Sequence, residues 1–572
     1  MLRSLAPPVF LPDGTEFKTW EVPCAFTRTL YVDAPNPAAS DKNPGTRYRP
    51  LKTIGRAADL LEPGERVIVA AGVYRERVRP RRGGTGPDRL ISYEAAPGAE
   101  VILKGSQVFK ETWAPADAPG AAGATRTWSS PLAASYFADY NPFDTDNVTP
   151  EQFDHMSWAQ PLRGKVPYTL PRGMVFQDGR RLAQVARVEA LADAEGTYWV
   201  DRKAQVLHVR PFGGGDANGR LWEITTERVA FGPEEIGLGY IRVKGFTVEQ
   251  VGNAFPMQQE GAISTWRGHH WIIEGNTVRE VNGVGIDVGC QFGHWPQPPV
   301  IGHHIVRGNT ITDAGVCGIA GLGTRNDFHL LIEGNIVRRA AYHDVERLYE
   351  TAGIKTHLNT NCLIRGNLVA DTLHGPGIWM DYTNANSRCT RNLIVGTQTQ
   401  WHGGIFVEAS SIPNLIDQNV IWGTHGNGIY EHDSCRQVFA HNLIAHSTGA
   451  AILLRGKVSD RKPYGKPIVD GGNRVTGNVF LENDQNEVVV RTTNEPNAIE
   501  GNLTGGVTAD FDEGTLTLRW SVTATPPACP GIEALTHDFL GAPRRGSAPA
   551  PGPLATLPSK PTPVSLWPVL GR

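Results

Sequence analysis

Two carboxylate side chains, those of Asp381 and Glu408, end two similar apolar phrases of the sequence. The phrases read Gly-Ile-Trp-Met-Asp and Gly-Ile-Phe-Val-Glu, and their carboxylates are 27 residues apart. If the phrases are equivalent strands on neighbouring coils of a repeat, the strands lie about 4.8 Å apart and the carboxyl groups roughly 5 Å apart. Retaining glycosidases separate their two carboxyl groups by about 5–5.5 Å, whereas an inverting pair needs about 6.5–9.5 Å. The spacing therefore predicts glycoside hydrolysis with retention.

The neighbours expected beside each carboxylate suggest its role. Lys355 and His357 stand one repeat before Asp381, and nearby positive charge favours the ionised form that a nucleophile needs. Glu408 is expected among aromatic side chains, and an apolar setting raises a carboxyl pKa towards use as a general acid. His432, one repeat later, either opposes that shift or hydrogen-bonds the acid. We therefore expect Asp381 to be the nucleophile and Glu408 the general acid/base.

A small residue followed by Ile recurs through the second half of the chain and sets the direction of its neighbours. If that Ile points inward, the residues one and three places later point outward. The two outward rows read Asp287, Ala320, Lys355, Trp379, Phe406, Tyr430 and Leu453, and Gly289, Leu322, His357, Asp381, Glu408, His432 and Arg455. Such rows predict a wall that stacks on sugar rings and binds their hydroxyls; an ordinary exposed sheet face is the alternative. The residues expected to contact the sugar are Glu350, Lys355, His357, Trp379, Tyr382, Phe406, Tyr430, His432 and Arg455.

The elements that must position these side chains are given by an internal repeat. A phrase of Asn and two mostly apolar residues recurs at intervals of 23 to 36 residues, at Asn276, Asn309, Asn335, Asn367, Asn392, Asn419, Asn442, Asn478 and Asn502. The segments between them are short, β-branched and broken by Gly, Asn and Asp, which is typical of a parallel β-helix. Asn at a fixed bend can stack from coil to coil. These Asn residues are therefore expected to hold the fold and to do no chemistry.

The predicted fold class is all-β, a right-handed parallel β-helix with an inserted β-sandwich domain. Residues 1–108 are expected to form an N-terminal cap and the first coils, because a helical segment at 56–61 precedes several short strands. Residues 109–230 depart from the repeat. They contain five Trp and segments that alternate like antiparallel strands, which indicates the inserted sandwich. Residues 231–522 form the main β-helix. Residues 523–572 are rich in Pro, Ala and Gly and are expected to run extended over the surface.

The amino-acid composition of the chain limits the kinds of molecule that it is expected to bind. Lys and Arg number 55 and Asp and Glu 58, for a net charge of −3, so neither nucleic acid nor an anionic membrane is expected. We find no apolar run of about 18 residues, and the first ten residues make a poor signal peptide, so a cytoplasmic location is expected. Seven scattered Cys without CxxC spacing argue against disulfides or structural zinc. No metal or cofactor is expected.

Four phrases of the sequence carry a resemblance to a known family. They are Glu350-Thr-Ala-Gly-Ile-Lys-Thr-His357, Gly377-Ile-Trp-Met-Asp381, Ile405-Phe-Val-Glu408 and His441-Asn-Leu-Ile444. In order and approximate spacing they resemble the β-xylosidases of glycoside hydrolase family 120, and the likeness extends to the N-terminal β-helix and to residues 175–182 of the insert.

That resemblance implies a β-helix interrupted by a β-sandwich, acting with retention on non-reducing-end xylose. It implies the same roles for Asp381 and Glu408, makes Glu350 a third carboxylate of the sugar subsite, and suggests a homo-oligomer. The segments after the two carboxylates, residues 382–386 and 409–413, depart from the family pattern. The reaction type is therefore better supported than the sugar.

The sequence thus predicts a retaining glycoside hydrolase that acts on a xylan-derived or related oligosaccharide, β-xylosidase-like and exo-acting. A polysaccharide lyase is the runner-up, since many lyases are β-helices. It would use Lys355, His357 or Arg455 as base and charge neutraliser. A non-catalytic carbohydrate-binding β-helix ranks last, because it gives no reason for Asp381 and Glu408 to stack.

Overall fold

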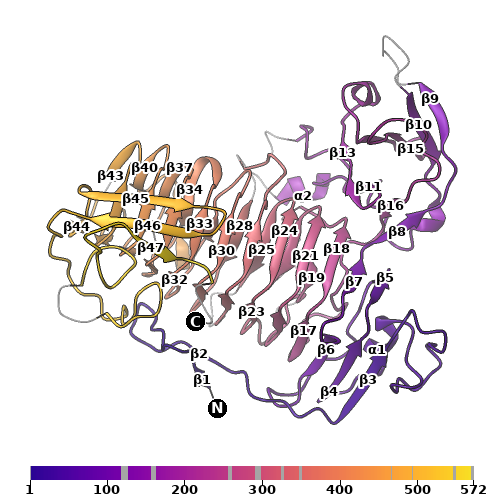
Figure 1. Cartoon of the computed structure of the whole chain (residues 1–572), viewed down its shortest axis with the longest axis horizontal. Coiled ribbons are helices and arrows are strands. Elements are labelled where there is room, and N and C mark those ends of the chain that lie inside the picture. Colours follow the sequence, from indigo (N-terminus) through magenta and orange to yellow (C-terminus); the bar gives the residue numbers. More distant parts are fainter. Residues whose placement is uncertain are drawn as a thin grey trace.

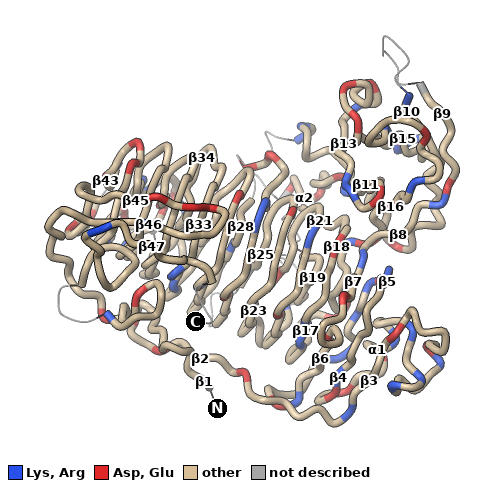
Figure 2. Tube along the Cα trace, viewed as in Figure 1, with Lys and Arg blue, Asp and Glu red and all other residues tan. Residues whose placement is uncertain are grey.

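The computed structural model of this chain describes residues 2–117, 126–155, 163–255, 260–289, 298–323, 328–346, 351–465, 467–491, 494–544 and 549–568. Within them the chain winds into a long column of strands, and a lobe of antiparallel strands stands off one end (Figure 1). Acidic and basic residues are interspersed along the whole tube (Figure 2), in keeping with the net charge of −3. No helix in the described part of the chain is long and apolar enough to span a membrane.

The column is a right-handed parallel β-helix, which confirms the predicted fold class. In the described ranges it has three parallel sheets of 13, 11 and 9 strands, here called sheets 1, 2 and 3. Sheet 1 consists of β3 (Arg28–Val32), β4 (Glu65–Val69), β6 (Ile91–Ala95), β17 (Ile241–Lys244), β20 (Ile272–Glu274), β23 (Ile305–Arg307), β26 (Leu331–Glu333), β29 (Leu363–Arg365), β32 (Arg388–Thr390), β35 (Leu415–Asp417), β38 (Val438–Ala440), β41 (Arg474–Thr476) and β44 (Ala498–Glu500).

The other two sheets complete each coil. Sheet 2 consists of β5 (Gly72–Tyr74), β7 (Val101–Lys104), β18 (Thr247–Val251), β21 (Thr277–Val281), β24 (Thr310–Ala314), β27 (Ile336–Arg338), β30 (Leu368–Ala370), β33 (Leu393–Val395), β36 (Val420–Trp422), β39 (Leu443–Ala445) and β42 (Val479–Leu481). Sheet 3 consists of β19 (Gly261–Ser264), β22 (Val284–Asp287), β25 (Cys317–Leu322), β28 (Ala352–His357), β31 (Ile378–Asp381), β34 (Gln398–Glu408), β37 (His425–His432), β40 (Ala450–Leu454) and β43 (Gln485–Val490).

The recurring Ile of sheet 3 points into the column, as the alternation of side chains requires. Ile354 pairs with Ile378, Ile378 with Ile405, and Ile405 with Ile429. All four are fully buried in the central hydrophobic cluster that runs the length of the column. One face of each strand therefore faces the core, and the residues one and three places after each Ile point to the other side.

The Asn ladder is present at the bend between sheets 1 and 2. Each side-chain oxygen accepts hydrogen bonds from the backbone N–H and the side-chain amide of the Asn one coil earlier, and each amide also donates to a backbone carbonyl. At Asn392, for example, Oδ1 accepts from N and Nδ2 of Asn367 at 3.0 and 2.9 Å, and Nδ2 donates to the carbonyl of Ile364 at 3.1 Å. The structural role predicted for these residues is confirmed.

The segment that interrupts the column lies between β7 and β17. It contains two sheets, one of β9 (Ala114–Asp117), β10 (Arg126–Pro131), β13 (Ala183–Gln184), β14 (Thr197–Asp201) and β15 (Val206–Arg210), the other of β8 (Ser106–Phe109), β11 (Val175–Gln177), β12 (Arg180–Arg181) and β16 (Trp222–Thr225). Its short elements outside the sheets are η1 (Ala134–Tyr136), α2 (Pro150–His155) and η3 (Val188–Ala192). Both sheets contribute to one hydrophobic cluster that includes Trp128 and Trp222. Their arrangement as a sandwich stays a prediction.

The two ends of the chain cover the column. Helix α1 (Ile54–Leu60) begins at the N-cap Thr53 and buries Ile54 and Ala57 in the core. The N-terminal strands β1 (Arg3–Ser4) and β2 (Lys18–Thr19) pair with each other. The short helix η5 (Pro463–Gly465) precedes a C-terminal sheet of β45 (Val507–Asp512), β46 (Thr517–Val522) and β47 (Thr562–Ser565).

The C-terminal tail does more than run over the surface. It supplies β47 to that sheet, and Phe539 and Leu566 are fully buried in a cluster with Leu393 of sheet 2. The tail thereby shields the outer face of sheet 2 from water, which an extended surface chain would not do.

Candidate active site

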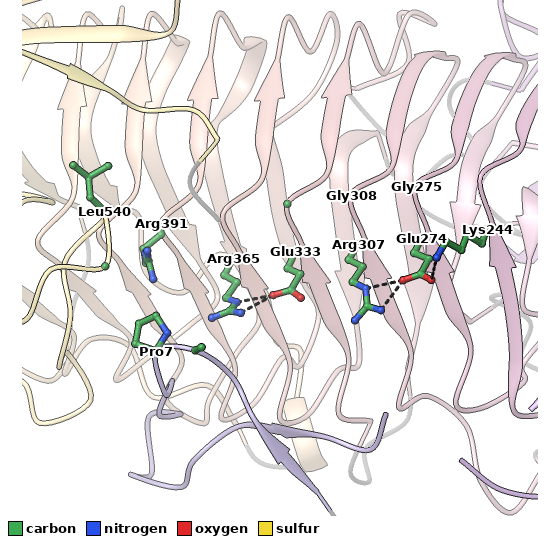
Figure 3. Close-up of a pocket in the computed structure, with 13 residues that line it drawn as sticks. Pro7, Lys244, Glu274, Gly275, Arg307, Gly308, Glu333, Arg365, Arg391 and Leu540 are labelled. Atoms are coloured by element: carbon green, nitrogen blue, oxygen red, sulfur yellow. Dashed lines mark hydrogen bonds and ion pairs between the residues drawn. The ribbon is translucent and has the colours of Figure 1, made fainter. Parts of the chain in front are cut away.

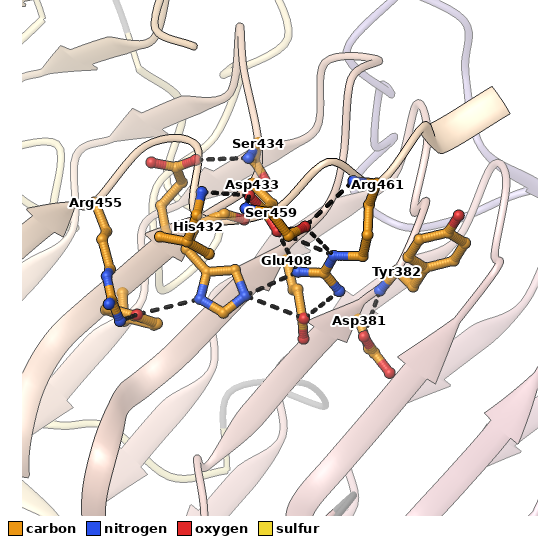
Figure 4. Close-up of polar contacts among 12 residues, drawn as sticks. Asp381, Tyr382, Glu408, His432, Asp433, Ser434, Arg455, Ser459 and Arg461 are labelled. Carbon is orange, nitrogen blue, oxygen red and sulfur yellow. Dashed lines mark hydrogen bonds and ion pairs between the residues drawn. The ribbon is translucent and has the colours of Figure 1, made fainter. Parts of the chain in front are cut away.

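The predicted carboxylates lie at the ends of neighbouring strands of sheet 3 (Figure 4). Asp381 is the last residue of β31 and Glu408 the last of β34. Trp379 pairs with Phe406, so the two carboxylates occupy equivalent positions one coil apart. Their carboxyl groups are close enough that each changes the pKa of the other. The predicted register is confirmed.

Asp381 is held among cations and is almost fully buried. Lys355 Nζ lies 2.7 Å from its Oδ2, and His357 Nδ1 lies 3.5 Å from the same oxygen. The backbone N–H of Tyr382 donates to Oδ1 at 2.6 Å. Burial raises the pKa of Asp381 to about 6; Lys355 opposes the rise and the negative charge of Glu408 adds to it. At neutral pH the carboxylate is therefore ionised, which suits the nucleophile expected here.

Glu408 has polar neighbours that its sequence context did not indicate. Its Oε1 accepts from Arg461 Nη1 at 2.5 Å and lies 3.1 Å from His432 Nε2, and its Oε2 accepts from Trp379 Nε1 at 3.1 Å. Burial raises the pKa of Glu408, but His432 and Arg461 outweigh it and hold the pKa well below its ordinary value. The raised pKa expected from an apolar setting is wrong, because two basic groups, His432 and Arg461, contact the carboxylate directly. The acid/base role itself stays a prediction.

Arg461 is the site residue that the sequence did not reveal. It lies between β40 and β41, and its guanidinium joins Glu408 to Asp433, with Nη2 2.6 Å from Asp433 Oδ2 (Figure 4). Ser459 Oγ donates to the same Asp433 oxygen at 2.5 Å. Arg461 falls outside every repeated phrase, so the strand period gives no signal for it.

The aromatic row forms a support for the carboxylates instead of an open wall. Phe406 is 0% exposed, Tyr430 2% and Trp379 7%. They pack in one cluster with residues of the inserted segment, among them Phe153 and Tyr168. Phe406 is therefore closed to a sugar ring in this arrangement, whereas the sugar contacts expected of Trp379 and Tyr430 stay a prediction. The inserted segment lies far from these strands in the sequence, so the repeat could not predict that it packs in the same cluster.

The remaining predicted residues extend the polar network. His432 Nδ1 lies 3.1 Å from the hydroxyl of Tyr430, which also accepts from Arg455 Nη1 at 2.8 Å. Arg455 is exposed, and Tyr382 is half-buried with its ring 5.9 Å from the guanidinium carbon of Arg461. Glu350, expected as a third carboxylate, lies outside the described residues.

The arrangement combines a parallel β-helix with two adjacent carboxylates, each balanced by its own basic groups. A family model described as "Right handed beta helix region" matches residues 261–444. No curated protein matches the chain. Among solved structures, the complex of XylC with xylose is 22% identical and has a TM-score of 0.71, over 94% of this chain and 100% of that one.

Two more distant solved structures are also similar. A structure described as a glycoside hydrolase is 13% identical over 74% of this chain and 96% of that one, with a TM-score of 0.43. A GH136 lacto-N-biosidase from Eubacterium ramulus is 13% identical over 81% and 68%, also with a TM-score of 0.43. Because the likeness to XylC covers most of this chain, at the level of the fold it confirms the resemblance drawn from the sequence phrases.

Proposed function

We propose that this chain is a retaining glycoside hydrolase that releases xylose from the non-reducing end of xylan-derived oligosaccharides. The observation that carries the proposal is the Asp381–Glu408 pair, two interacting carboxylates on adjacent coils with separate basic partners. Strands on adjacent coils lie about 4.8 Å apart, which favours the close pair of a double-displacement mechanism over the wider inverting pair. The xylose in the XylC complex, on a fold shared along the whole chain, favours xylose as the sugar.

The reaction has two steps. Glu408 gives its proton to the glycosidic oxygen while an Asp381 oxygen attacks the anomeric carbon, so the glycosidic bond breaks and a glycosyl ester forms. In the second step the Glu408 carboxylate takes a proton from water, whose oxygen attacks the anomeric carbon and displaces Asp381. Lys355 stabilises the carboxylate that leaves in this step, because its ammonium is held 2.7 Å from Asp381 Oδ2.

The ligand-free arrangement holds Glu408 ionised. Its pKa lies well below the ordinary value while that of Asp381 is about 6, so at neutral pH both groups are carboxylates. Glu408 must take up a proton before the first step, and the ion pair with Arg461 opposes this. Separation of Arg461 from Glu408, as a sugar enters between them, would restore the acid.

The test is turnover of a panel of nitrophenyl glycosides, led by the β-xyloside and the α-arabinofuranoside. We expect turnover of one sugar by the wild type, none by Asp381→Asn, and a loss in Glu408→Gln that azide partly rescues. Asp371→Asn is the matched control, because Asp371 is a half-exposed carboxylate paired with Arg338 away from the site. No turnover of any sugar by the wild type would overturn the proposal.

A second measurement assigns the roles. A 2-deoxy-2-fluoro xylosyl fluoride traps the covalent intermediate, and peptide mass spectrometry locates the label. Label on Asp381 is expected. Label on Glu408 would keep the retaining mechanism but reverse the two roles, an outcome consistent with the low pKa of Glu408.

A lyase is the second candidate, and one contact disfavours it. A lyase base must be neutral to take a proton, but the ammonium of Lys355 is fully buried against the Asp381 carboxylate, which favours its charged form. Unsaturated products that absorb in the ultraviolet would identify a lyase; their absence from digests that release free xylose supports the hydrolase.

A further inference from the structure

A groove runs along the outer side of sheet 1, whereas the carboxylate pair lies on sheet 3. Its cavity measures about 670 Å³ and is lined by charged residues at or after the ends of successive strands (Figure 3). They are Lys244, Glu274, Arg307, Glu333, Arg365 and Arg391. Pro7 of the N-terminal segment and Leu540 of the C-terminal segment flank one end. None of these residues belongs to the candidate active site.

Most of these charges neutralise one another from coil to coil. Glu274 lies 3.5 Å from Lys244 and 2.6 Å from Arg307, and Glu333 lies 2.7 Å from Arg365. Arg391 differs, because it forms no ion pair with any residue in the described ranges. The six charged lining residues carry four positive and two negative charges, but Glu21, outside the lining, also pairs with Arg307 at 2.6 Å, so the unpaired positive charge lies at Arg391.

Arg391 and Arg365 are both buried at that end, with 5% and 4% of their surface exposed. Arg391 Nε donates to the carbonyl of Phe539 at 2.8 Å. This nitrogen of Arg391 therefore holds the C-terminal segment in place. Its two terminal nitrogens make no hydrogen bond to a described residue. Arg365 Nη1 is buried and likewise has no hydrogen-bond partner in the described part of the chain.

Arg391, which has no paired carboxylate among the described residues, is costly to bury beside Arg365, and the negative charges of Asp538 and Asp417 offset only part of that cost. Burial, followed by repulsion from Arg365, lowers the pKa of Arg391 to about 10. An uncompensated buried charge destabilises a protein unless a counter-charge binds it. A guanidinium presents a planar fork of N–H donors that fits carboxylate and phosphate oxygens.

We propose that the Arg365–Arg391 end of this groove binds the oxyanion of a small ligand, a phosphate or a carboxylate. The terminal nitrogens of Arg391 and Nη1 of Arg365 are the donors. A phosphate offers more acceptor oxygens to these donors than a carboxylate does, which favours phosphate. This site takes part in no step of the proposed hydrolysis, and its ligand is recognised by charge and not by a sugar ring.

The test is calorimetric titration at constant ionic strength with inorganic phosphate, glucuronate and, as neutral probe, glucose. We expect saturable binding of phosphate, weaker binding of glucuronate and none of glucose. Arg391→Gln keeps an amide near the carbonyl of Phe539 and should weaken phosphate binding about tenfold or more. Lys244→Gln is the matched control at the far end of the groove, where the ammonium is half-exposed and paired with Glu274. Its affinity should stay within about twofold of wild type.

Two results would overturn the proposal. One is an absence of saturable heat from either anion with the wild type. The other is equal weakening by Lys244→Gln and Arg391→Gln, which would show only general attraction to a basic surface. If Arg391→Gln fails to fold, Arg365→Gln replaces it, and the readout is the phosphate-dependent rise in melting temperature that binding to the folded state alone produces. These measurements involve no turnover of a glycoside, so their outcome does not depend on whether the protein is a hydrolase.

Discussion

Arg461 and Glu408 form an ion pair of 2.5 Å between a loop and a strand of the column. The same guanidinium also binds Asp433, so it is fixed from two sides. The pair keeps the expected acid deprotonated in the ligand-free protein, while the expected nucleophile has the higher pKa. If Glu408 is the acid and Asp381 the nucleophile, the reaction proceeds from the minority of molecules in which the proton is on Glu408 and not on Asp381.

Arg461→Gln should therefore change the pH dependence of kcat/KM. Removal of the guanidinium raises the pKa of Glu408, so the protonated acid persists to higher pH. Because Glu408 has the lower pKa of the pair, it sets the acid limb of the profile, and we expect that limb to move up by about one pH unit. Arg455→Gln is the control, because Arg455 bonds to the hydroxyl of Tyr430 and not to Glu408; it should leave that limb in place. An unchanged limb in Arg461→Gln would mean that Arg461 does not govern the acid.

Lys355→Met should destabilise the protein and move the basic limb of the kcat/KM profile to higher pH. The variant leaves Asp381 buried without its ammonium partner, which costs about 3–5 kcal/mol. The pKa of Asp381, already about 6, rises further, and because it is the higher pKa of the pair it sets the basic limb. Chemical denaturation at pH 7 measures the cost. The double variant Lys355→Met/Asp381→Asn removes both charges and should recover part of the stability; a double variant as unstable as the single one would refute the pairing argument.

Asn392→Ala should destabilise the column without altering the site. The substitution leaves N–H groups of Asn367 and the carbonyl of Ile364 unpaired in the core, at about 1–3 kcal/mol for each lost partner. Asn502→Ala is the matched control, because Asn502 is the last rung and is only partly buried. It should cost less than half as much. Equal losses of stability in the two variants would show that a central position in the ladder contributes no more than the hydrogen bonds of a terminal one.

The repeat explains why the column and the carboxylate pair could be predicted. Each coil buries one Ile and one Asn at fixed places, so the register from Ile378 to Ile405 follows from the sequence and carries Asp381 and Glu408 with it. A second amide ladder escaped notice. Asn414 bonds to Gln437, whose backbone N–H bonds to Asn473, and the change of residue type hides the pattern.

The parts that could not be predicted come from segments without a period. Arg461 lies in a loop whose length differs from those of other coils, and its contact with Glu408 spans 53 residues. Phe153 and Tyr168 belong to the same hydrophobic cluster as the aromatic row, although they come from an insert more than 200 residues away in the chain. Such contacts depend on tertiary packing, and no local pattern of apolar residues records them.

Glu431 makes the last prediction, because it points into the column between the outward Tyr430 and His432. It is fully buried, accepts the N–H of Ser434 at 3.0 Å, and burial raises its pKa to about 8. In the unfolded chain it ionises near the ordinary value of 4.5. Between these values only the folded state holds the proton, so stability falls as pH rises, by about 1.4 kcal/mol per pH unit.

Glu431→Gln removes this dependence, since the amide stays neutral at every pH. The variant should gain stability relative to wild type steadily from pH 5 to pH 8, as measured by urea denaturation at several pH values. Glu487→Gln, at an exposed position on β43, is the control and should show no such trend. If Glu431→Gln and wild type keep a constant difference across that range, Glu431 is ionised in the folded protein, and a buried cation must then compensate it.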